Sequence, residues 1–300
     1  MYMEIFSELI KKENLSLALG FFDGVHRGHR KVISSAVNYA KINGLKSAVI
    51  TFKNHPFCYF RKIEPKYILT ESERRKKIAD LGADYLFELD FEKIASMSAK
   101  DYMENIIVKN FSPKSIFTGF NHCFGKGKSG DTKFLADNAE KYGYEYFMIT
   151  PQKFGEELIS STIIRKYLKE GNIKKANQML GDNFGIDGCV VKGRQLGRQI
   201  GFKTANIIMP ERIVEIPFGA YSTSVIYKDK TYKGVTNYGI RPTVNNTNTA
   251  TVETHILDFD KDIYGENIRV EFINMLRTEK RFSSLEDLKT QIANDINSVL

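Results

Sequence analysis

The chain has 300 residues, of which 42% are hydrophobic and 27% are charged, and its formal net charge at pH 7 is +8. This composition is typical of a soluble globular protein, and the length allows two domains that each bury a core. No run of 18 apolar residues occurs and no basic segment precedes an apolar one at the N-terminus, so we expect a cytoplasmic protein without signal peptide or membrane span.

The three cysteines are far apart in the sequence and form neither a metal-binding nor a disulfide pattern, which favours a reducing compartment. The positive net charge is compatible with a nucleic acid partner or with a small polyanionic substrate such as a nucleotide. Because the lysines and arginines are scattered along the chain, composition alone does not decide between these two classes.

The N-terminal half alternates short apolar runs with helical patterns. A capping box, Thr70 to Glu73, predicts a helix to about Asp80; Ser98 is expected to cap a second helix, and a third is expected over 131–142. The apolar runs typical of strands are 15–19, 47–52, 85–89, 115–119 and 144–150. This alternation predicts a parallel sheet covered on both faces, with ligands bound at the carboxyl ends of its strands. Three segments that follow strands are therefore expected to converge there: 20–29, 51–56 and 119–131.

The segment Gly20–His29, with the sequence GFFDGVHRGH, is a glycine-rich turn between a strand and a helix. Glycine lets the backbone approach a ligand closely, and the free N–H groups at a helix N-terminus favour a phosphate. His26 and His29 are three positions apart and lie on the same side of the helix start. Two imidazoles there can donate hydrogen bonds to charge that develops on a phosphate during transfer. A metal-binding pair is the alternative, but no third ligand stands nearby in the sequence.

This pattern resembles the HxGH nucleotidyltransferase signature, in the form found in the bacterial bifunctional riboflavin kinase/FAD synthetases. Thr51–Pro56 resembles the TFxPHP turn of that family, with Asn54 where proline is usual. Gly119–Asp131 resembles its GxDFxFGxxxxGD segment, with Asn121 at the Asp/Asn position. Ile159–Arg165 resembles its ISSTxIR motif. The segments occur in the order expected for the FAD synthetase half.

The resemblance implies a Rossmann-like domain that transfers the adenylyl group of ATP to FMN and releases pyrophosphate. It places His26 and His29 at the phosphates and Asn121 in the flavin and nucleotide cleft. The ATP-binding residues that it implies are Gly20, Phe21, Asp23, Gly24, Gly28, Ser161, Thr162 and Arg165. Hydroxyls and a guanidinium one helical turn apart can share a triphosphate, although Ser161 and Thr162 at a helix start could equally be caps.

Beyond residue 162 the pattern changes. Two short helices over 163–169 and 173–180 lead to a junction at residues 181–183, so the predicted domains are 1–182 and 183–300. Runs with a period of two follow and indicate strands over 186–192, 220–227, 233–237, 249–257 and 268–276. A hairpin turn at 228–230 and a last helix from about Ser283 complete the pattern. These features predict a small antiparallel β-barrel that ends in a helix.

The segment from 193 to 206 resembles the riboflavin kinase signature, a glycine- and arginine-rich flap that ends in G-F/I-P-T-A-N. Thr204 and Asn206 offer oxygen ligands of the kind that Mg²⁺ prefers. The resemblance implies that the flap covers ATP through Gly193, Arg198 and Gly201.

Downstream segments match the kinase half as well, and one of them holds the general base of the family, which falls on Glu253. A carboxylate is suited to accept the proton of the ribityl 5′-hydroxyl while phosphate moves. The residues alone do not distinguish Glu253 from Glu271, because both lie in predicted strands. Asn237 and Arg277 are implied flavin contacts, and a surface role is the alternative for Arg277.

One departure from the family pattern is Lys203, which stands where proline usually precedes Thr-Ala-Asn. Proline would fix φ and bias the preceding residue to an extended conformation, whereas lysine loosens this restraint and adds a cation near the ATP phosphates. We expect kinase activity to persist with an altered affinity for ATP.

The resemblance covers residues 15–298 and implies an enzyme that makes FMN from riboflavin and FAD from FMN, using ATP and Mg²⁺ in both steps. Two alternatives stay open: an FAD synthetase whose kinase half has drifted, and a basic module that binds RNA. Against the second, the predicted barrel lacks clustered aromatic residues of the kind that stack on bases. We expect small-molecule substrates, no nucleic acid partner and no membrane association, and the sequence does not indicate the oligomeric state.

Overall fold

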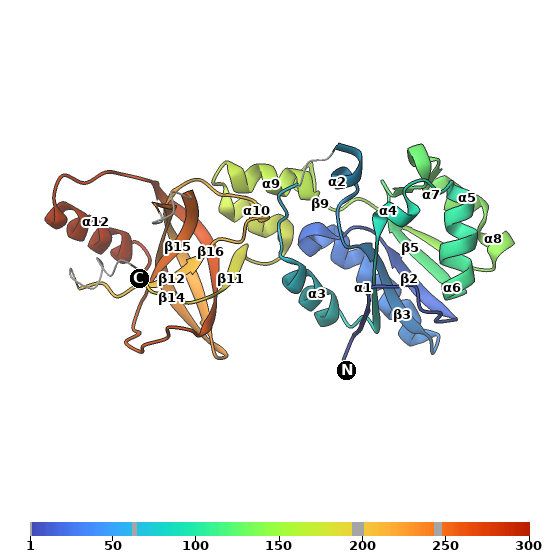
Figure 1. Cartoon of the computed structure of the whole chain (residues 1–300), viewed down its shortest axis with the longest axis horizontal. Helices are drawn as coiled ribbons and strands as arrows, with labels where there is room; N and C mark the ends of the chain where they lie inside the picture. Colours follow the sequence, from blue (N-terminus) through green and yellow to red (C-terminus); the bar gives the residue numbers. More distant parts are fainter. Residues whose placement is uncertain (1, 62–64, 194–200, 243–247) are drawn as a thin grey trace. The chain divides into compact units, whose positions relative to one another are not determined.

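The computed structural model describes residues 2–61, 65–193, 201–242 and 248–300, and the chain divides into two compact units, Met1–Ser161 and Thr162–Leu300 (Figure 1). Helix α9 (Ser161–Lys169), apart from its first residue, and helix α10 (Ile173–Leu180) thus group with the second unit by compactness. The functional boundary at residue 182 stays a prediction.

The first unit is built on a six-stranded parallel sheet with the strand order β1-β4-β3-β2-β5-β8. The five strands expected from apolar runs are confirmed, with ends that agree within one residue. The additional strand β1 is only three residues long and partly exposed, so it carries no apolar alternation that would have indicated it. The strands are β1 (Glu4–Phe6), β2 (Leu15–Leu19), β3 (Lys46–Phe52), β4 (Tyr85–Leu89), β5 (Ser115–Gly119) and β8 (Glu145–Ile149).

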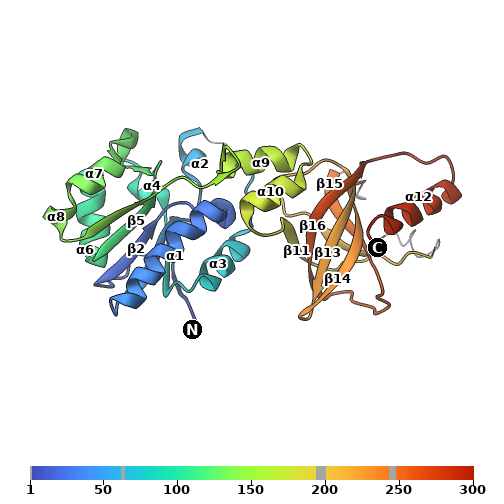
Figure 2. The same cartoon turned by 180° about the vertical axis from the view of Figure 1, so that it is seen from behind.

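Helices cover both faces of this sheet (Figure 2). The capping box at Thr70 is present, and Ser98 caps the second expected helix, which includes a π-helical segment over Tyr102–Val108. The expected helix over 131–142 is divided at Asn138, whose backbone departs from helical geometry. The helices are α1 (Arg27–Ile42), α2 (Pro56–Arg61), α3 (Glu71–Asp80), α4 (Phe91–Ile94), α5 (Ala99–Asp101), α6 (Lys109–Phe111), α7 (Thr132–Asp137) and α8 (Ala139–Tyr142).

The central strand β2 shows why both faces are covered. Its leucines pack into a core with Met103 and Ile107 of the π-helical segment. Its intervening Ser16 points to the other side, where the hydroxyl donates to the carbonyl of Ala36 in α1 at 2.8 Å. Successive residues of a strand face opposite sides of the sheet, so this strand is buried on both.

The topology places the three expected loop segments at one edge. Strand β2 lies between β3 and β5, and all three run parallel. The segments that follow them, beginning at residues 20, 53 and 120, therefore leave the sheet at the same end. The expectation that these segments follow strands at one edge of the sheet is confirmed.

The second unit is an antiparallel six-stranded sheet with the order β11-β16-β13-β14-β15-β12. A bridge between Val191 and Asn206 joins the chain beside β11 to β12, so the sheet curls into a nearly closed barrel. The expected turn joins β13 to β14 through Lys228 and Asp229, which both have positive φ. The strands are β11 (Gly185–Cys189), β12 (Ala205–Ile208), β13 (Gly219–Tyr227), β14 (Lys230–Pro242), β15 (Asn248–Ile256) and β16 (Asn267–Thr278).

The barrel interior contains Tyr221 and Tyr238, both fully buried, together with a ladder of threonine hydroxyls. Thr236 stands within 2.8 Å of both Thr223 and Thr254 in this ladder. Neighbouring residues of the same strands face outward. The last helix, α12 (Leu285–Asn297), is capped by Ser284 and follows the barrel, as expected.

Candidate active sites

The histidine pair of the first unit is held at the start of α1. His26 caps this helix, and its Nδ1 accepts a hydrogen bond from the backbone N–H of His29 at 3.3 Å. The two imidazole rings stack with centroids 3.5 Å apart, and the Phe22 ring meets His29 edge-on at 5.3 Å. The predicted proximity of the two histidines at the helix N-terminus is therefore confirmed as geometry.

The backbone of this turn requires small residues. A Cβ at Gly28 would stand 3.2 Å from a carbon of the His26 ring and would push the imidazole aside. Gly24 has φ of +82°, in the left-handed region that favours glycine. Phe22 and Val25 also have positive φ, which is costly for such side chains and is found mostly at functional turns. A Cβ at Gly20 would clash with the Phe22 ring.

The electrostatics of the turn favour a neutral His29. Burial, and then the charge of neighbouring His26, hold the pKa of His29 well below its usual range. Its Nδ1 has no hydrogen-bond partner among the residues that the structure describes. A neutral imidazole carries one donor and one acceptor, so His29 retains polar capacity for a ligand.

Two residues expected at the ATP site brace the turn. The Asp23 Oδ1 accepts a hydrogen bond from the backbone N–H of Ile68 at 2.9 Å. The Ser161 hydroxyl donates to the Asp23 carbonyl, also at 2.9 Å. These contacts fix the turn between its neighbours. Any contact that Asp23 and Ser161 make with ATP stays a prediction.

The turn after β3 contacts the histidine turn. The Thr51 hydroxyl donates to the Phe21 carbonyl at 2.9 Å, and the His55 ring meets the Phe21 ring edge-on at 4.6 Å. The backbone N–H of His55 donates to the Tyr67 hydroxyl at 3.3 Å. The motif that resembles TFxPHP is thus attached directly to the GFFDGVHRGH turn.

Exposed aromatic rings follow this second turn and were missed by the sequence reasoning. Phe57, Tyr59 and Phe60 of α2 are 47%, 45% and 61% exposed, and Phe120, after β5, is 40% exposed. Large apolar rings are usually buried, so their exposure beside a polar site suits a flat ligand. Their spacing directly after His55-Pro56 was the available signal.

Asn121 is exposed in the loop after β5, where the topology predicts a ligand. Its neighbour His122 is more enclosed, and burial lowers the pKa of His122 to about 4. Thr162 and Arg165 lie in α9, which belongs to the second compact unit. Their proposed contacts with the phosphates stay predictions.

The barrel presents polar side chains in one cross-strand row. Asn206 of β12 pairs with Glu253 of β15, and Glu253 pairs with Asn237 of β14. The same row continues through Ala220 of β13 to Arg277 of β16. Directly paired residues share a face, so β-sheet geometry places these residues on the outer face of the barrel.

Glu253 accepts a hydrogen bond from the Thr204 hydroxyl at 2.8 Å. The Asn206 amide nitrogen lies 3.5 Å from the same hydroxyl, and Asn206 is 3% exposed. Its Oδ1 is buried and has no hydrogen-bond partner among the described residues. A Cβ at Gly193 would stand 2.7 Å from the Asn206 amide, so only glycine lets the chain pass so close. Hydroxyl and amide oxygens at this point fit a hard divalent cation.

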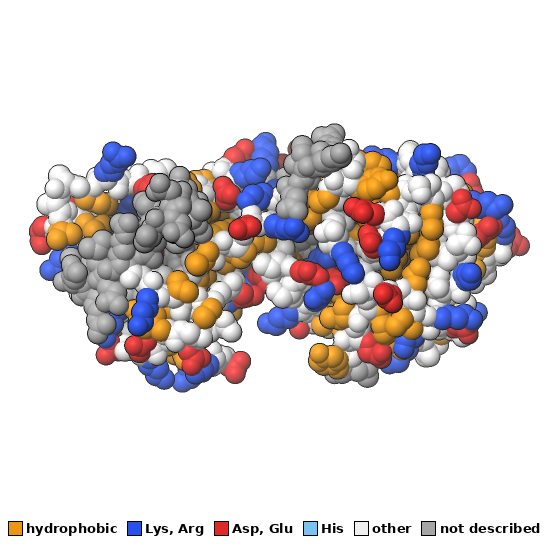
Figure 3. All heavy atoms as spheres, in the orientation of Figure 1, with side chains coloured by type: hydrophobic (Ala, Val, Ile, Leu, Met, Phe, Trp, Pro, Cys, Tyr) orange, Lys and Arg blue, Asp and Glu red, His pale blue; other side chains and the backbone are white. Residues whose placement is uncertain are grey.

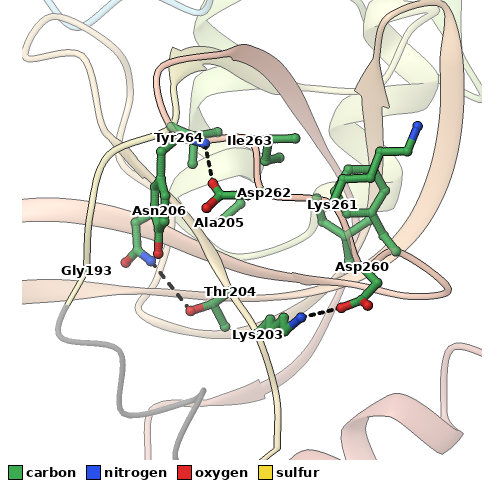
Figure 4. Close-up of a pocket in the computed structure, with 13 residues that line it drawn as sticks. Gly193, Lys203, Thr204, Ala205, Asn206, Asp260, Lys261, Asp262, Ile263 and Tyr264 are labelled. Carbon is green, nitrogen blue, oxygen red and sulfur yellow. Dashed lines mark hydrogen bonds and ion pairs between the residues drawn. The ribbon is translucent and has the colours of Figure 1, made fainter.

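A pocket of about 770 Å³, including space open to solvent, lies beside this pair. Figure 4 shows Thr204 and Asn206 on its wall, with Lys203 ion-paired to Asp260. The Tyr264 N–H donates to the Asp262 carboxylate at 3.1 Å on the same wall. Glu253 reaches the pocket through Thr204.

The remaining predicted kinase residues have different environments. Arg277 forms an ion pair with Asp295 of α12, with Nη2 to Oδ2 at 2.8 Å, so its guanidinium attaches this helix to the barrel. Asn237 is exposed on the row described above, and Gly201 has φ of +92°. Arg198 lies outside the described residues. Flavin or ATP contacts of these four residues stay predictions.

Glu271, the alternative to Glu253, is engaged elsewhere. Its Oε1 is 3.1 Å from Arg269 Nε, and its Oε2 accepts a hydrogen bond from the Asn183 amide at 3.1 Å. Thus Glu271 braces the start of the barrel, whereas Glu253 contacts a pocket residue.

Metal ligation by the histidine pair gains no support. Within the described ranges, no group of three His, Cys, Asp or Glu side chains is placed to hold a metal ion.

Lysines and arginines on the face in Figure 3 are interspersed with acidic residues rather than gathered in one patch. Among the residues that the structure describes, no helix is long and apolar enough to cross a membrane.

Comparison with known proteins identifies a family for each half of the chain. A family model for FAD synthetase matches residues 9–163, and one for riboflavin kinase matches residues 180–300. A bifunctional riboflavin kinase/FMN adenylyltransferase from Bacillus subtilis is 34% identical, over 96% of this chain and 92% of its own length. The protein of that name from Escherichia coli is 35% identical, over 95% and 91%.

A solved structure has the same fold. A crystal structure described as a macrolide-efflux protein from Streptococcus pneumoniae superposes with a TM-score of 0.87 at 29% identity, covering 99% of both chains. That description belongs to the other protein. The two family models match the two halves in this order, the curated relatives span nearly the whole chain, and the chain belongs to the bifunctional riboflavin kinase/FMN adenylyltransferase family.

Proposed function

We propose that this chain phosphorylates riboflavin to FMN at the barrel site and transfers the adenylyl group of ATP to FMN at the histidine site. The observation that carries the proposal is the presence of both arrangements in one chain: the stacked His26 and His29 at the start of α1, and the contact between Thr204 and Glu253. Family membership supports the assignment of each arrangement to its reaction.

Adenylylation needs a site for phosphates and no strong base. A phosphate oxygen of FMN attacks the α-phosphorus of ATP, a new P–O bond forms, and the bond to the β-phosphate breaks as pyrophosphate leaves. The nucleophile is already an anion, so positioning and stabilisation of charge dominate. Backbone N–H groups at the start of α1 and the imidazoles of His26 and His29 are suited to donate to the phosphate oxygens.

Phosphorylation of riboflavin starts from a neutral hydroxyl. The ribityl 5′-oxygen attacks the γ-phosphorus of ATP, ADP leaves, and the hydroxyl proton passes to a base. Glu253 is proposed as this base because Glu271 is bonded to Arg269 and Asn183. The Thr204 hydroxyl orients the carboxylate through its hydrogen bond.

Mg²⁺ is proposed to accompany ATP at the barrel site. Bound there, it would neutralise charge on the phosphates and hold them for transfer. Thr204 Oγ1 and Asn206 Oδ1, which has no hydrogen-bond partner among the described residues, are the oxygens proposed to hold it. Gly193 leaves the space in which Asn206 is held.

The flavin of the first unit is proposed to lie against the exposed rings of α2 and Phe120. Isoalloxazine is flat and apolar over much of its area, so it would stack on such rings while its phosphate tail reached the histidine turn. Asn121 is proposed as a polar contact in the same cleft. We further propose that the protein acts in the cytoplasm on small molecules, without a nucleic acid partner.

A product assay tests the proposal. Purified protein is incubated with ATP and Mg²⁺ and either riboflavin or FMN, and the flavins are separated over time. FMN and then FAD from riboflavin would support both activities. If FAD forms only in the reaction that starts from FMN, the kinase half is impaired. If folded protein gives no product in either reaction, the proposal is contradicted.

A further inference from the structure

A buried arginine connects the two loops of the histidine site. The Arg74 side chain, in α3, is only 7% exposed. Its Nη2 donates to the Phe52 carbonyl at 3.2 Å, and its Nη1 reaches the Phe21 carbonyl at a longer 3.5 Å. The guanidinium also lies over the Phe21 ring, 5.1 Å from the centroid. One side chain therefore contacts both loops.

The two contacted residues have corresponding positions. Phe21 opens the turn that leads from β2 to His26, and Phe52 ends β3 just before the turn that leads to His55. Carbonyls at strand ends lack partners in the sheet, and the planar guanidinium can donate to several acceptors with fixed geometry. The distance between the two turns thus depends on this rigid group as well as on the hydrogen bond from Thr51 to the Phe21 carbonyl.

The arginine is itself held in place. The capping box fixes the start of α3, four residues before Arg74. Arg74 Nη2 is 3.2 Å from Oε1 of Glu88, a carboxylate of β4 that is fully buried. A buried charge is tolerated when it is paired, and this pair leaves the guanidinium little freedom.

The neighbouring arginine provides a matched control. Arg75 uses its Nε and Nη2 to bind the other oxygen of Glu88, at 3.0 Å and 2.6 Å. It also pairs with Glu71 on the same helix. Both arginines share the buried carboxylate, but the contacts found for Arg75 are with Glu88 and Glu71 rather than with the loops.

We infer that Arg74 is a positioning residue for the adenylyl transfer proposed above, on which this role rests. It sets the distance between the histidine turn and the turn carrying His55 and the exposed rings of α2. In this role Arg74 touches no substrate. It keeps the groups proposed for the phosphates in register with those proposed for the flavin.

The kinetic test compares Arg74→Gln, Arg74→Lys and Arg75→Gln in the full-length chain. We expect Arg74→Gln to lower kcat for FMN adenylylation about 10- to 100-fold, because small displacements of reacting groups cost rates of that size. The Michaelis constant for ATP should change much less. Riboflavin kinase activity, measured in the same samples, should stay at the wild-type level in all three variants.

The spectroscopic test does not depend on activity. The His55 ring stands 4.6 Å from the Phe21 ring, so its NMR resonances report on the distance between the turns. Arg74→Gln should shift the His55 ring signals, whereas Arg75→Gln should leave them in place. His255, in the other unit, serves as the reference signal.

Each result has a defined meaning. Wild-type kcat and His55 signals in Arg74→Gln would overturn the inference, as would equal losses of kcat in the Arg74→Gln and Arg75→Gln variants. If Arg74→Gln fails to fold, Arg74→Lys provides the test. Lysine keeps the positive charge for Glu88 but lacks the planar set of N–H donors that contacts both carbonyls. Wild-type kcat and His55 signals in Arg74→Lys would overturn the inference. Absence of FAD synthesis in the wild type would contradict the proposed function, while the His55 signals would still test the spacing.

Discussion

The two units offer different chemistry to the same co-substrate. The first presents stacked imidazoles and helix N–H groups, with the pKa of His29 held low by burial. The second presents a carboxylate beside a hydroxyl and a buried amide. This difference corresponds to the proposed nucleophiles, since the phosphate of FMN is already an anion whereas the hydroxyl of riboflavin must lose a proton. The protonation state of the nucleophile, rather than the presence of ATP, therefore determines which groups each site needs.

The units also build their sites in different ways. In the first, loops from three adjacent parallel strands meet at one sheet edge. In the second, β12, β15 and β14 place one residue each in a cross-strand row. Loop sites depend on contacts that keep the loops together, whereas a row is positioned by the ladder of backbone hydrogen bonds.

The largest expected effect of a substitution concerns Glu253, the proposed base of the second unit. Glu253→Gln keeps the size of the side chain and its hydrogen bond with Thr204 but removes the proton acceptor. We expect riboflavin phosphorylation to fall about 10²- to 10⁴-fold, with FMN adenylylation unchanged. Initial rates of both reactions on one preparation measure this, with Glu271→Gln as the control. Normal FMN production by Glu253→Gln would remove Glu253 from the mechanism.

The complementary change is His29→Ala. Loss of one donor to developing phosphate charge should lower FAD formation about 10²- to 10³-fold and leave the kinase reaction intact. The two rates are measured as above, and circular dichroism reports whether the variant keeps the overall secondary structure of the wild type. Normal FAD synthesis by a folded His29→Ala variant would contradict the assignment of the histidine site.

The sequence predicted the parts of the molecule that depend on local patterns. Apolar runs located the strands of the first sheet, and hydrogen-bonding side chains identified the helix starts at Thr70 and Ser98. Placing β2 between β3 and β5 required topology, but the rule that ligands bind at carboxyl ends already indicated which loops meet.

Long-range side-chain contacts could not be predicted in this way. Nothing near Arg74 in the sequence indicates that its guanidinium contacts Phe21 and Phe52. The family resemblance selected Glu253 over Glu271, but the partners that distinguish the two glutamates come from other parts of the chain and could not be predicted from periodicity. Strand β12 was not predicted; its first two residues, Ala205 and Asn206, formed the end of the predicted flap motif.

A further prediction concerns the ion pair that attaches α12 to the barrel of the second unit. Asp295→Ala removes the partner of Arg277, whose side chain is 15% exposed, and should lower the free energy of unfolding by about 2–4 kcal/mol. Urea denaturation measures this, with Lys289→Ala on the exposed face of α12 as the control. If Arg277 also contacts flavin, the Michaelis constant for riboflavin should rise as well. An unchanged stability would show that the ion pair does not hold the helix.

The buried imidazole of His122 predicts a pH dependence for the first unit. Its pKa is about 4 in the folded protein, because burial disfavours the charged ring, and about 6.5 when the chain is unfolded. The unfolded chain therefore binds the proton more readily, and stability is lost as pH falls from about 6.5 towards 4. As pH falls over this range, the free energy of unfolding of wild type should decrease by about 1–3 kcal/mol more than that of His122→Asn. Urea unfolding at several pH values measures how the free energy of unfolding changes with pH. Equal slopes for the two proteins would contradict the lowered pKa of His122.

The smallest expected effect concerns Lys203, the departure from the family pattern, which lies on the wall of the pocket beside Thr204 and Asn206. Its ammonium pairs with Asp260, and the lysine lowers the pKa of that exposed carboxyl. If the ATP phosphates bind the Lys203 ammonium, they compete for it with the Asp260 carboxylate. Lys203→Met should then raise the Michaelis constant for ATP, and Asp260→Asn should lower it, each by about two- to fivefold because exposed ion pairs are weak.

Lys203→Pro separates the charge from the backbone restraint that proline would supply. A rise like that of Lys203→Met would assign the effect to the lost cation, whereas a Michaelis constant below that of Lys203→Met would show that a fixed φ compensates for it. FMN adenylylation by the same variants provides the control, since Lys203 belongs to the other unit. Shifts of the same sign in Lys203→Met and Asp260→Asn would contradict competition between ATP and Asp260, and the ion pair would then act by holding the pocket wall.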